Sequence, residues 1–243
     1  MKHLLAFIAL TLVLTGCASL NEPKLLQPLT KVALVSVVSN DQLYFRGDKP
    51  PQPSVANGLL SQQTNQGNSN ALLNTVLEKT DGLLAKGDEL LTTALGSARG
   101  VTLTTKDDLF ASKVYQGAWD DKLGGMVLLT PVGYRFVKAD DPNLASGLAK
   151  QLGVNGLFTA NFLFQKEVTL GVADNGSMGA RTTLTITAHD ATGRLVFRQV
   201  YLGQSKDTEL LVAGVYDPQK FQVLGEQATK AAVDKFATDL AAH

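Results

Sequence analysis

Hydrophobic and polar positions alternate with two different periods along the chain, which predicts both strands and helices. Residues 31–38 (KVALVSVV) form a run of apolar and β-branched residues, typical of a strand that is buried on both faces. From Asn70 to about residue 95, apolar residues recur at spacings of three and four, which predicts an amphipathic helix. Gly82 and Gly87 each cost a helix about 1 kcal/mol relative to alanine, so we expect a bend or break near them. The apolar stripe indicates core packing, with a partner-binding helix as the alternative.

A second helix is predicted at 142–152, where Asp141 supplies a capping oxygen before Pro142 and Gly153 ends the helix. After this helix the period changes from 3.6 to 2. Residues 157–164 and 181–189 alternate apolar and polar side chains, as half-buried antiparallel strands do. We expect one face of the second strand to meet water, and its side chains are Arg181, Thr183, Thr185, Thr187 and His189.

Turn signals separate the predicted strands of the second half. Asn175-Gly176 indicates a turn in the connection 171–180, and residues 190–193 (DATG) indicate a tight turn before a hairpin partner at 195–202. Asp217-Pro218 then opens a last helix, whose apolar side is formed by Phe221, Leu224, Ala228, Ala232, Val233, Phe236 and Leu240. Shorter strands are predicted at 101–105 and 126–130.

This order of elements predicts an α/β (α+β mixed) fold with one layered domain over residues 31–243. The domain should contain a mixed sheet, a C-terminal antiparallel hairpin and packing helices. Pro50, Pro51 and Pro53 exclude a central strand from residues 46–70, so we expect a long flexible loop there.

The N-terminus carries a targeting signal. Lys2 precedes an apolar run, Leu4 to Leu14, that is too short to span a bilayer but has the length of a secretory h-region. The run ends in Leu14-Thr15-Gly16-Cys17, which resembles the lipobox of bacterial lipoproteins. The resemblance implies that residues 1–16 are a signal peptide and that Cys17 becomes the first residue, acylated (for example with palmitate) on sulfur and amine.

The resemblance also implies a membrane anchor and a location. Two or three acyl chains hold a protein on a membrane far more firmly than one chain does. Residues 17–30 would be the lipidated tether, and Ala18 favours the outer membrane, with the domain facing the periplasm. Without Lys2 the chain has 21 Lys and Arg against 22 Asp and Glu, so its charge gives no preference for anionic lipids.

A second resemblance lies in the mature chain. Residues 144–164 (LASGLAKQLGVNGLFTANFLF) are similar to a helix-to-strand segment of several envelope proteins. These are the curli-secretion lipoproteins, the lipoprotein activators of penicillin-binding proteins, and the N-terminal domain of the Tol–Pal periplasmic protein. The strand 32–38, the turn 190–194 and the closing alanine-rich helix fit the same pattern. These families share an α/β fold and an envelope location, but no single activity, and they imply no functional residues here.

Composition and motifs give little support for catalysis, a cofactor or a metal. One cysteine and three histidines leave few soft ligands, and P-loop, H-E-x-x-H, C-x-x-C and G-x-S-x-G motifs do not occur. His189 is the one internal histidine, expected to be a solvated strand residue, with a general base as the alternative. The pairs at 107–108, 120–121 and 140–141 lack the spacing of a calcium loop. A net charge of zero and sparse aromatics argue against a nucleic-acid partner.

One apolar segment, residues 210–216 (LLVAGVY), has two interpretations. It forms an added strand in the core, or it forms an exposed patch or edge strand that meets a partner. The residues of the second interpretation are Leu210, Leu211, Val212, Val215 and Tyr216. We therefore expect a non-catalytic envelope lipoprotein that binds a protein partner or self-associates. The alternatives are a binding module for a small envelope ligand (a glycan, lipid or peptidoglycan fragment) and a hydrolase with an unrecognised site.

Overall fold

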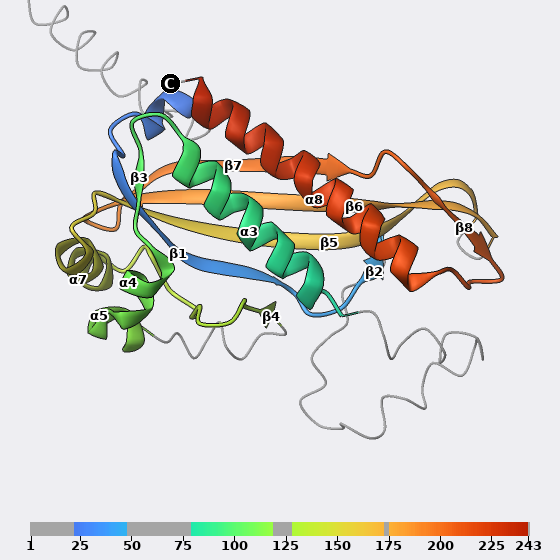
Figure 1. Cartoon of the computed structure of the whole chain (residues 1–243), viewed down its shortest axis with the longest axis horizontal. Helices are drawn as coiled ribbons and strands as arrows, with labels where there is room; N and C mark the ends of the chain where they lie inside the picture. Colours follow the sequence, from blue (N-terminus) through green and yellow to red (C-terminus); the bar gives the residue numbers. More distant parts are fainter. Residues whose placement is uncertain (1–21, 48–78, 119–127, 173–174, 243) are drawn as a thin grey trace, which may run out of the picture.

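A mixed eight-stranded sheet forms the centre of the protein in the computed structural model, which describes residues 22–47, 79–118, 128–172 and 175–242 (Figure 1). The five main strands lie in the order β3 (Thr102–Leu103), β1 (Lys31–Asn40), β5 (Gly156–Val172), β6 (Asn175–Asp190) and β7 (Leu195–Gln204). The shorter strands β2 (Tyr44–Phe45), β4 (Leu128–Leu129) and β8 (Glu209–Val212) pair with β5, β1 and β6. The α/β fold with a mixed sheet and a C-terminal hairpin is confirmed.

Strand β1 is the centre of the parallel part of the sheet. It runs parallel to both β3 and β5, and six consecutive residues, 32–37, are buried. A strand covered on both faces needs apolar side chains on both, which is why its sequence is a continuous apolar run instead of an alternating one. Strand β6 is antiparallel to both of its neighbours, β5 and β7, and these three strands carry the period-2 pattern.

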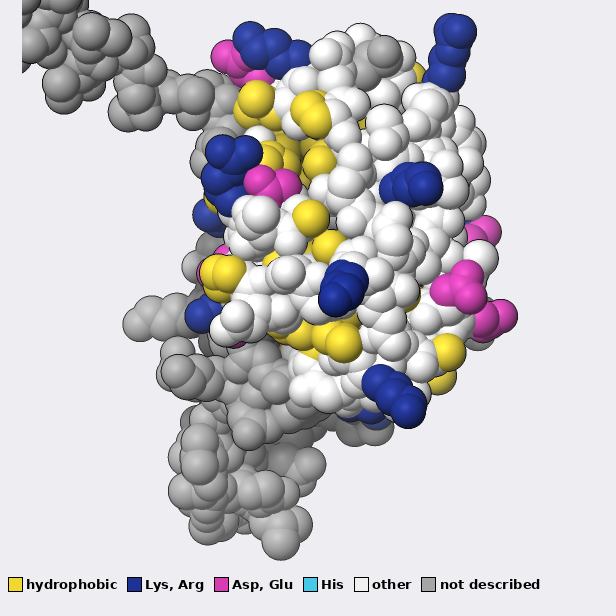
Figure 2. All heavy atoms as spheres, turned by 90° about the vertical axis from the view of Figure 1, so that its left-hand side faces the viewer, with side chains coloured by type: hydrophobic (Ala, Val, Ile, Leu, Met, Phe, Trp, Pro, Cys, Tyr) yellow, Lys and Arg dark blue, Asp and Glu magenta, His cyan; other side chains and the backbone are white. Residues whose placement is uncertain are grey.

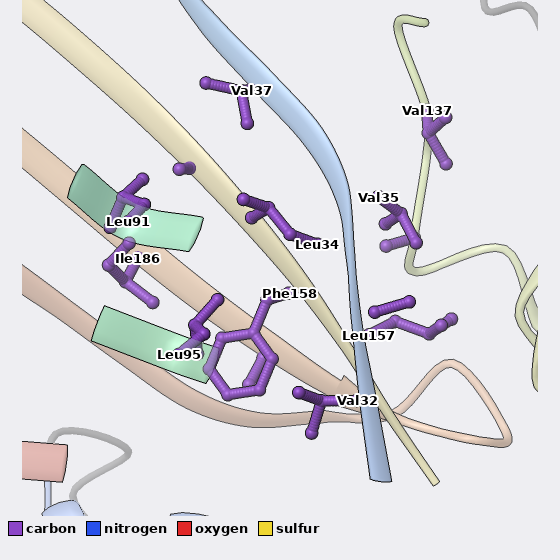
Figure 3. Packing of buried hydrophobic residues seen from close by; sticks show 14 of the residues in the cluster. Val32, Leu34, Val35, Val37, Leu91, Leu95, Val137, Leu157, Phe158 and Ile186 are labelled. Atoms are coloured by element: carbon purple, nitrogen blue, oxygen red, sulfur yellow. The ribbon is translucent and has the colours of Figure 1, made fainter. Parts of the chain in front are cut away.

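Two helices, α3 (Asp81–Ser97) and α8 (Pro218–Ala241), cover one face of the sheet (Figure 1). Leu91 and Leu95 of α3 pack towards Leu34, Phe158 and Ile186 of three neighbouring strands (Figure 3). All seven apolar residues predicted for the buried side of the last helix are buried. The two helices approach each other at Gly225, where an added Cβ would lie 2.5 Å from Leu83.

The opposite face of β1 is covered by residues 130–140 and by the helices α5 (Lys113–Gln116) and α7 (Pro142–Leu152). Val137 lies on this side of the sheet together with Val35 and Leu157 (Figure 3). The sheet is therefore covered on both faces only around β1. On the face opposite α3 and α8, the side chains of β6 and β7 are left partly exposed. Helix α4 (Lys106–Ala111) follows β3 at the sheet edge, and the 3-10 helix η1 (Pro23–Leu26) lies against β7.

The predicted helix caps are confirmed in detail. The carboxylate of Asp141 accepts hydrogen bonds from the backbone N–H of Asn143 and Leu144, at 2.9 and 3.2 Å. Gly153 ends α7 with φ of +65°, a left-handed conformation that favours glycine. The carboxylate of Asp217 caps α8 in the same manner, in front of Pro218.

The start of the long helix was predicted wrongly. Helix α3 begins at Asp81, because Lys79 forms a β-bridge with Gln42 and the hydroxyl of the buried Thr80 donates to the backbone oxygen of Asn40. Asn70 and the apolar residues up to 77 lie outside the described residues. The expected break near Gly82 and Gly87 is also absent from α3, which is continuous over 81–97.

The predicted turn at Asn175-Gly176 is wrong as well. These two residues pair with Val172 and Gly171 and belong to β6, so only residues 173–174 remain between β5 and β6. Strand β5 also extends well beyond the predicted residue 164. The long loop predicted at 46–70 falls almost entirely outside the described residues.

Candidate functional site at the far end of the sheet

Strand β8 lies at the end of the sheet farthest from η1 (Figure 1). Strand β7 leaves β6 after Gln204, which pairs with Arg181, and β8 then takes its place beside residues 175–178. These residues of β6 pair in turn with the last residues of β5. The segment 209–216 therefore completes the tip of the long β5–β6 hairpin.

The side chains of β8 alternate between a buried and an exposed face. Leu211 and Tyr216 are buried and pack with Met178 and Phe221 in a small apolar cluster under α8. Leu210, Val212 and Val215 are 64%, 55% and 51% exposed. Each of the two interpretations of this segment therefore holds for part of it. Leu211 and Tyr216 belong to the core, and the other three residues are exposed at the surface.

A tight turn presents the exposed valines. Val212 and Val215 exchange two backbone hydrogen bonds of 3.0 and 2.9 Å across Ala213 and Gly214, whose φ angles are +50° and +75°. Two consecutive positive φ angles are typical of the type I′ hairpin turn. The side-chain oxygen of Asn175 accepts the N–H of Ala213 at 3.0 Å. Since alanine carries a Cβ, this left-handed conformation costs about 1–2 kcal/mol.

Leu170 of β5 joins the same exposed face. It pairs with Ser177, which pairs with Leu210, so the three residues form one row across β5, β6 and β8. A bulge between Val168 and Leu170 moves Leu170 off the α8 side of the sheet, and its side chain is 73% exposed. We name the surface formed by Leu170, Leu210, Val212 and Val215 the tip surface. No pattern in the sequence indicates the bulge, so Leu170 was not predicted as part of the site.

Lys166 connects three segments of the chain close to the tip surface. It is buried on the α8 side of β5, with its amine 4.7 Å from the ring centre of Phe45 and 5.4 Å from that of Tyr216. A lysine ammonium near two aromatic faces gains cation–π attraction that partly replaces its lost hydration. The lysine therefore ties β2 and the chain after β8 to the central hairpin.

Charged residues border the tip surface on the same face of the sheet. Glu167 forms ion pairs with Arg46 and Arg181 and accepts a hydrogen bond of 2.8 Å from Gln204. Partial burial opposes ionisation of Glu167, yet the hydrogen bonds from Gln204 and Arg46 and the charge of Arg181 keep its pKa below the ordinary value. The tip surface is thus an apolar area next to a polar rim, as interaction sites often are.

His189 does not lie on a wet face as predicted. It is 7% exposed, and no group in the described part of the chain hydrogen-bonds its buried Nδ1. Burial lowers the pKa of the imidazole, although the charges of Asp140 and Asp190 act in the opposite direction. Both carboxylate oxygens of Asp190 are already occupied by Thr192 and Arg194. The other side chains predicted for this face, at 181, 183, 185 and 187, are half-buried.

Cys17 lies outside the described residues. Within the described ranges, no three His, Cys, Asp or Glu side chains come together in a way that could hold a metal ion. Also within them, no helix has the length and hydropathy needed to cross a membrane.

Comparisons with known proteins identify no named family. No protein-family model matches the chain, and no curated protein matches it. One solved structure, a hypothetical protein from Chlamydia trachomatis, aligns with 88% of this chain and 98% of its own length, at 14% sequence identity and a TM-score of 0.38. A similarity at this level carries no argument about function.

Proposed function

We propose that the protein is a membrane-anchored lipoprotein of the cell envelope that acts in the periplasm as a non-catalytic protein-binding or assembly component. The observation that carries this proposal is the tip surface, where four large apolar side chains are each more than half exposed. Apolar area exposed to water is a source of binding free energy, about 25 cal/mol for each Å² that a partner covers. Contiguous exposed apolar area beside a polar rim is typical of interaction sites.

The position of the tip surface supports a partner away from the membrane. Five residues separate Cys17 from the start of η1 at Pro23, and this length of chain can span at most about 20 Å. Strand β1 begins beside the first residue of β5, whereas the tip surface lies at the last residues of β5. The 17 residues of β5 span roughly 55 Å. An anchor at Cys17 would therefore hold the η1 end near the lipid and point the tip surface away from it.

The rigidity of the tip also fits binding. The type I′ turn, the Asn175 hydrogen bond and the Lys166 contacts fix the backbone that carries Leu210, Val212 and Val215. A preformed surface loses little conformational entropy when a partner binds. A partner with an apolar strand or helix face of similar size would bury these side chains, and the polar rim would set its orientation.

The test is site-specific photo-crosslinking in intact cells. A photoreactive residue replaces Leu210, Val212 or Leu170 in turn, and the matched control replaces Ala85, which is exposed on α3. We expect one envelope protein to crosslink from the three tip positions and not from position 85. The double variant L210T/V212T, which leaves the buried Leu211 in place, should fold and lose this crosslink. Equal products from tip and control positions, or none from the tip, would contradict the proposal.

The anchor is tested separately. Cys17→Ser should abolish metabolic labelling with palmitate and leave a precursor that retains residues 1–16. A Cys17→Ser protein that is still processed and still fractionates with membranes would show that the lipoprotein part of the proposal is wrong. This result would not affect the proposal for the tip surface, because the crosslinking experiment probes other residues than Cys17.

A further inference from the structure

A hollow with a volume of about 340 Å³ lies between α3, the end of β3 and the start of α4, at the other end of the sheet from the tip surface. Figure 2 views this end of the molecule and shows apolar side chains reaching the surface in separate patches among polar groups. The volume lies at the lower end of the range found for small-molecule sites. The residues that line the hollow are Leu34, Thr92, Gly96, Leu103, Thr104, Thr105, Lys106, Leu109 and Tyr134.

The walls of the hollow are mostly apolar, with one ionised group among them. Leu34 and Leu109 are buried core residues that close its inner end. The ammonium of Lys106 forms an ion pair with Asp88, whose side chain is 9% exposed, and lies 5.6 Å from the ring centre of Tyr134. The hydroxyl of Thr92 donates to the other carboxylate oxygen of Asp88 at 3.4 Å. Both carboxylate oxygens of Asp88 are thus engaged, while Lys106 has donors beyond the one that Asp88 accepts.

Gly96 provides an independent sign that the hollow is kept open. The other described glycines within α3, α7 and α8 are Gly82, Gly87, Gly147 and Gly225, and an added Cβ would lie within 3.2 Å of a neighbouring side chain at each of them. At Gly96 an added Cβ would meet no atom within 4 Å, and its φ is not positive. Glycine lowers helix stability relative to alanine, and neither close packing nor backbone conformation requires it here. Gly96 is exposed and lines the hollow, so its lack of a side chain leaves this part of the hollow open to solvent.

We propose that this hollow binds a small uncharged molecule with an apolar body and one carbonyl oxygen, which accepts a hydrogen bond from Lys106. The apolar body matches the leucine floor and the space beside Gly96. The ligand is uncharged because Lys106 and Asp88 neutralise each other. An anion would compete with Asp88 for Lys106, and a cation would compete with Lys106 for Asp88. This inference does not depend on the proposed protein-binding function.

The test uses three probes that share a six-carbon chain and differ in charge: hexanamide, hexanoate and hexylammonium. Binding is followed by the methyl NMR signals of leucine-labelled protein, in which Leu34, Leu103 and Leu109 report on the hollow. We expect saturable shifts of these three leucines with hexanamide, and an affinity at least fivefold weaker for the two ions. Leu210 and Leu170, at the tip surface, should not shift.

Variants at one helix position locate the binding. Gly96→Leu fills the hollow and should weaken hexanamide binding at least tenfold. Ala85→Leu, about three turns away on the same helix and outside the lining of the hollow, should leave the binding unchanged. If the Gly96→Leu variant does not fold, Gly96→Ala is tested in its place, and it should weaken hexanamide binding in the same direction by a smaller factor. The proposal is overturned by an absence of saturable shifts with all three probes, by equal affinity for the three, or by hexanamide binding that neither Gly96 variant reduces.

Discussion

At the scale of single residues, one hydroxyl group provides a hydrogen-bond partner for a backbone oxygen in the middle of β1. Strand β1 pairs with β3 at one end and with β4 at the other, and no strand among the described residues pairs with its middle on that side. The hydroxyl of Tyr115 donates to the oxygen of Val35 at 3.0 Å and accepts the N–H of Arg135 at 2.9 Å. Burial raises the pKa of this phenol to about 12, so it remains protonated. A side chain here replaces a strand partner.

Tyr115→Phe should therefore destabilise the protein more than the loss of one average hydrogen bond would. The ring stays packed, but the Val35 oxygen and the Arg135 N–H lose their shared partner, and we expect a loss of about 1–3 kcal/mol in urea unfolding. Tyr44→Phe is the matched control, because Tyr44 is only half-buried and water can replace its hydroxyl. Similar losses for the two variants would show that the Tyr115 hydroxyl has no special role.

His189 predicts a pH dependence of stability. Its pKa lies below the ordinary 6.5 because burial disfavours the charged imidazole, so the unfolded chain binds the proton more tightly than the folded one. The contribution of the neutral histidine is fully present above about pH 6.5 and is lost as the pH falls from there towards the lower folded-state pKa. Stability measured from pH 7.5 to 5 should decrease in the wild type and decrease less in His189→Gln. Parallel curves would contradict this explanation.

At the scale of elements, the glycines of α3 have two different roles. At Gly87 an added Cβ would lie 2.7 Å from the ring of Phe162, so glycine is needed for the helix to lie close to β5. At Gly96 the same atom would meet nothing within 4 Å. The sequence alone marks Gly87 as a helix-weakening residue, which is why a break was expected where the structure has a close helix-to-strand contact.

Alanine at these two positions should change stability in opposite directions. Gly87→Ala forces Phe162 or the helix to move and should cost about 1–3 kcal/mol. Gly96→Ala improves helix propensity without a clash and should gain up to about 1 kcal/mol. The measurement is the thermal unfolding temperature of the two variants relative to the wild type. An equal shift for both would mean that packing against Phe162 is not the reason for glycine at position 87.

The elements differ in how far their sequence predicted them. The strand at 31–38, the helix at 142–152 and the last helix were predicted well, because each has local signals such as a continuous apolar run or an Asp-Pro start. The start of α3 was missed because a bridge between Lys79 and Gln42 and the buried Thr80 hydroxyl decide it, and both are long-range contacts. The Asn175-Gly176 signal was overruled by cross-strand pairing in a hairpin that extends beyond it.

At the scale of the whole molecule, the layered α/β arrangement followed from the order of elements, but the candidate site followed only in part. Residues 210–216 were identified as an apolar segment, and periodicity alone did not decide which side chains face out. Leu170 joined them through a bulge and through pairing with Ser177, and neither is visible in the sequence. The hollow beside Gly96 depends on elements that are distant in the chain, so no single segment indicated it.

The parallel pairing of β1 with β5 has a consequence for the order of folding. Lys31 and Asn155, which join the two strands by a hydrogen bond, are 124 residues apart, whereas only residues 173–174 separate β5 from β6. Closing a long loop costs more entropy and takes longer than forming a hairpin. In pulse-labelled hydrogen exchange during refolding, amides of β5 and β6 should gain protection before those of β1, and simultaneous protection would contradict this order. The first strand of the sequence is then the last to be enclosed. Its apolar run 32–37 is the segment that a chaperone would meet most readily before the sheet closes.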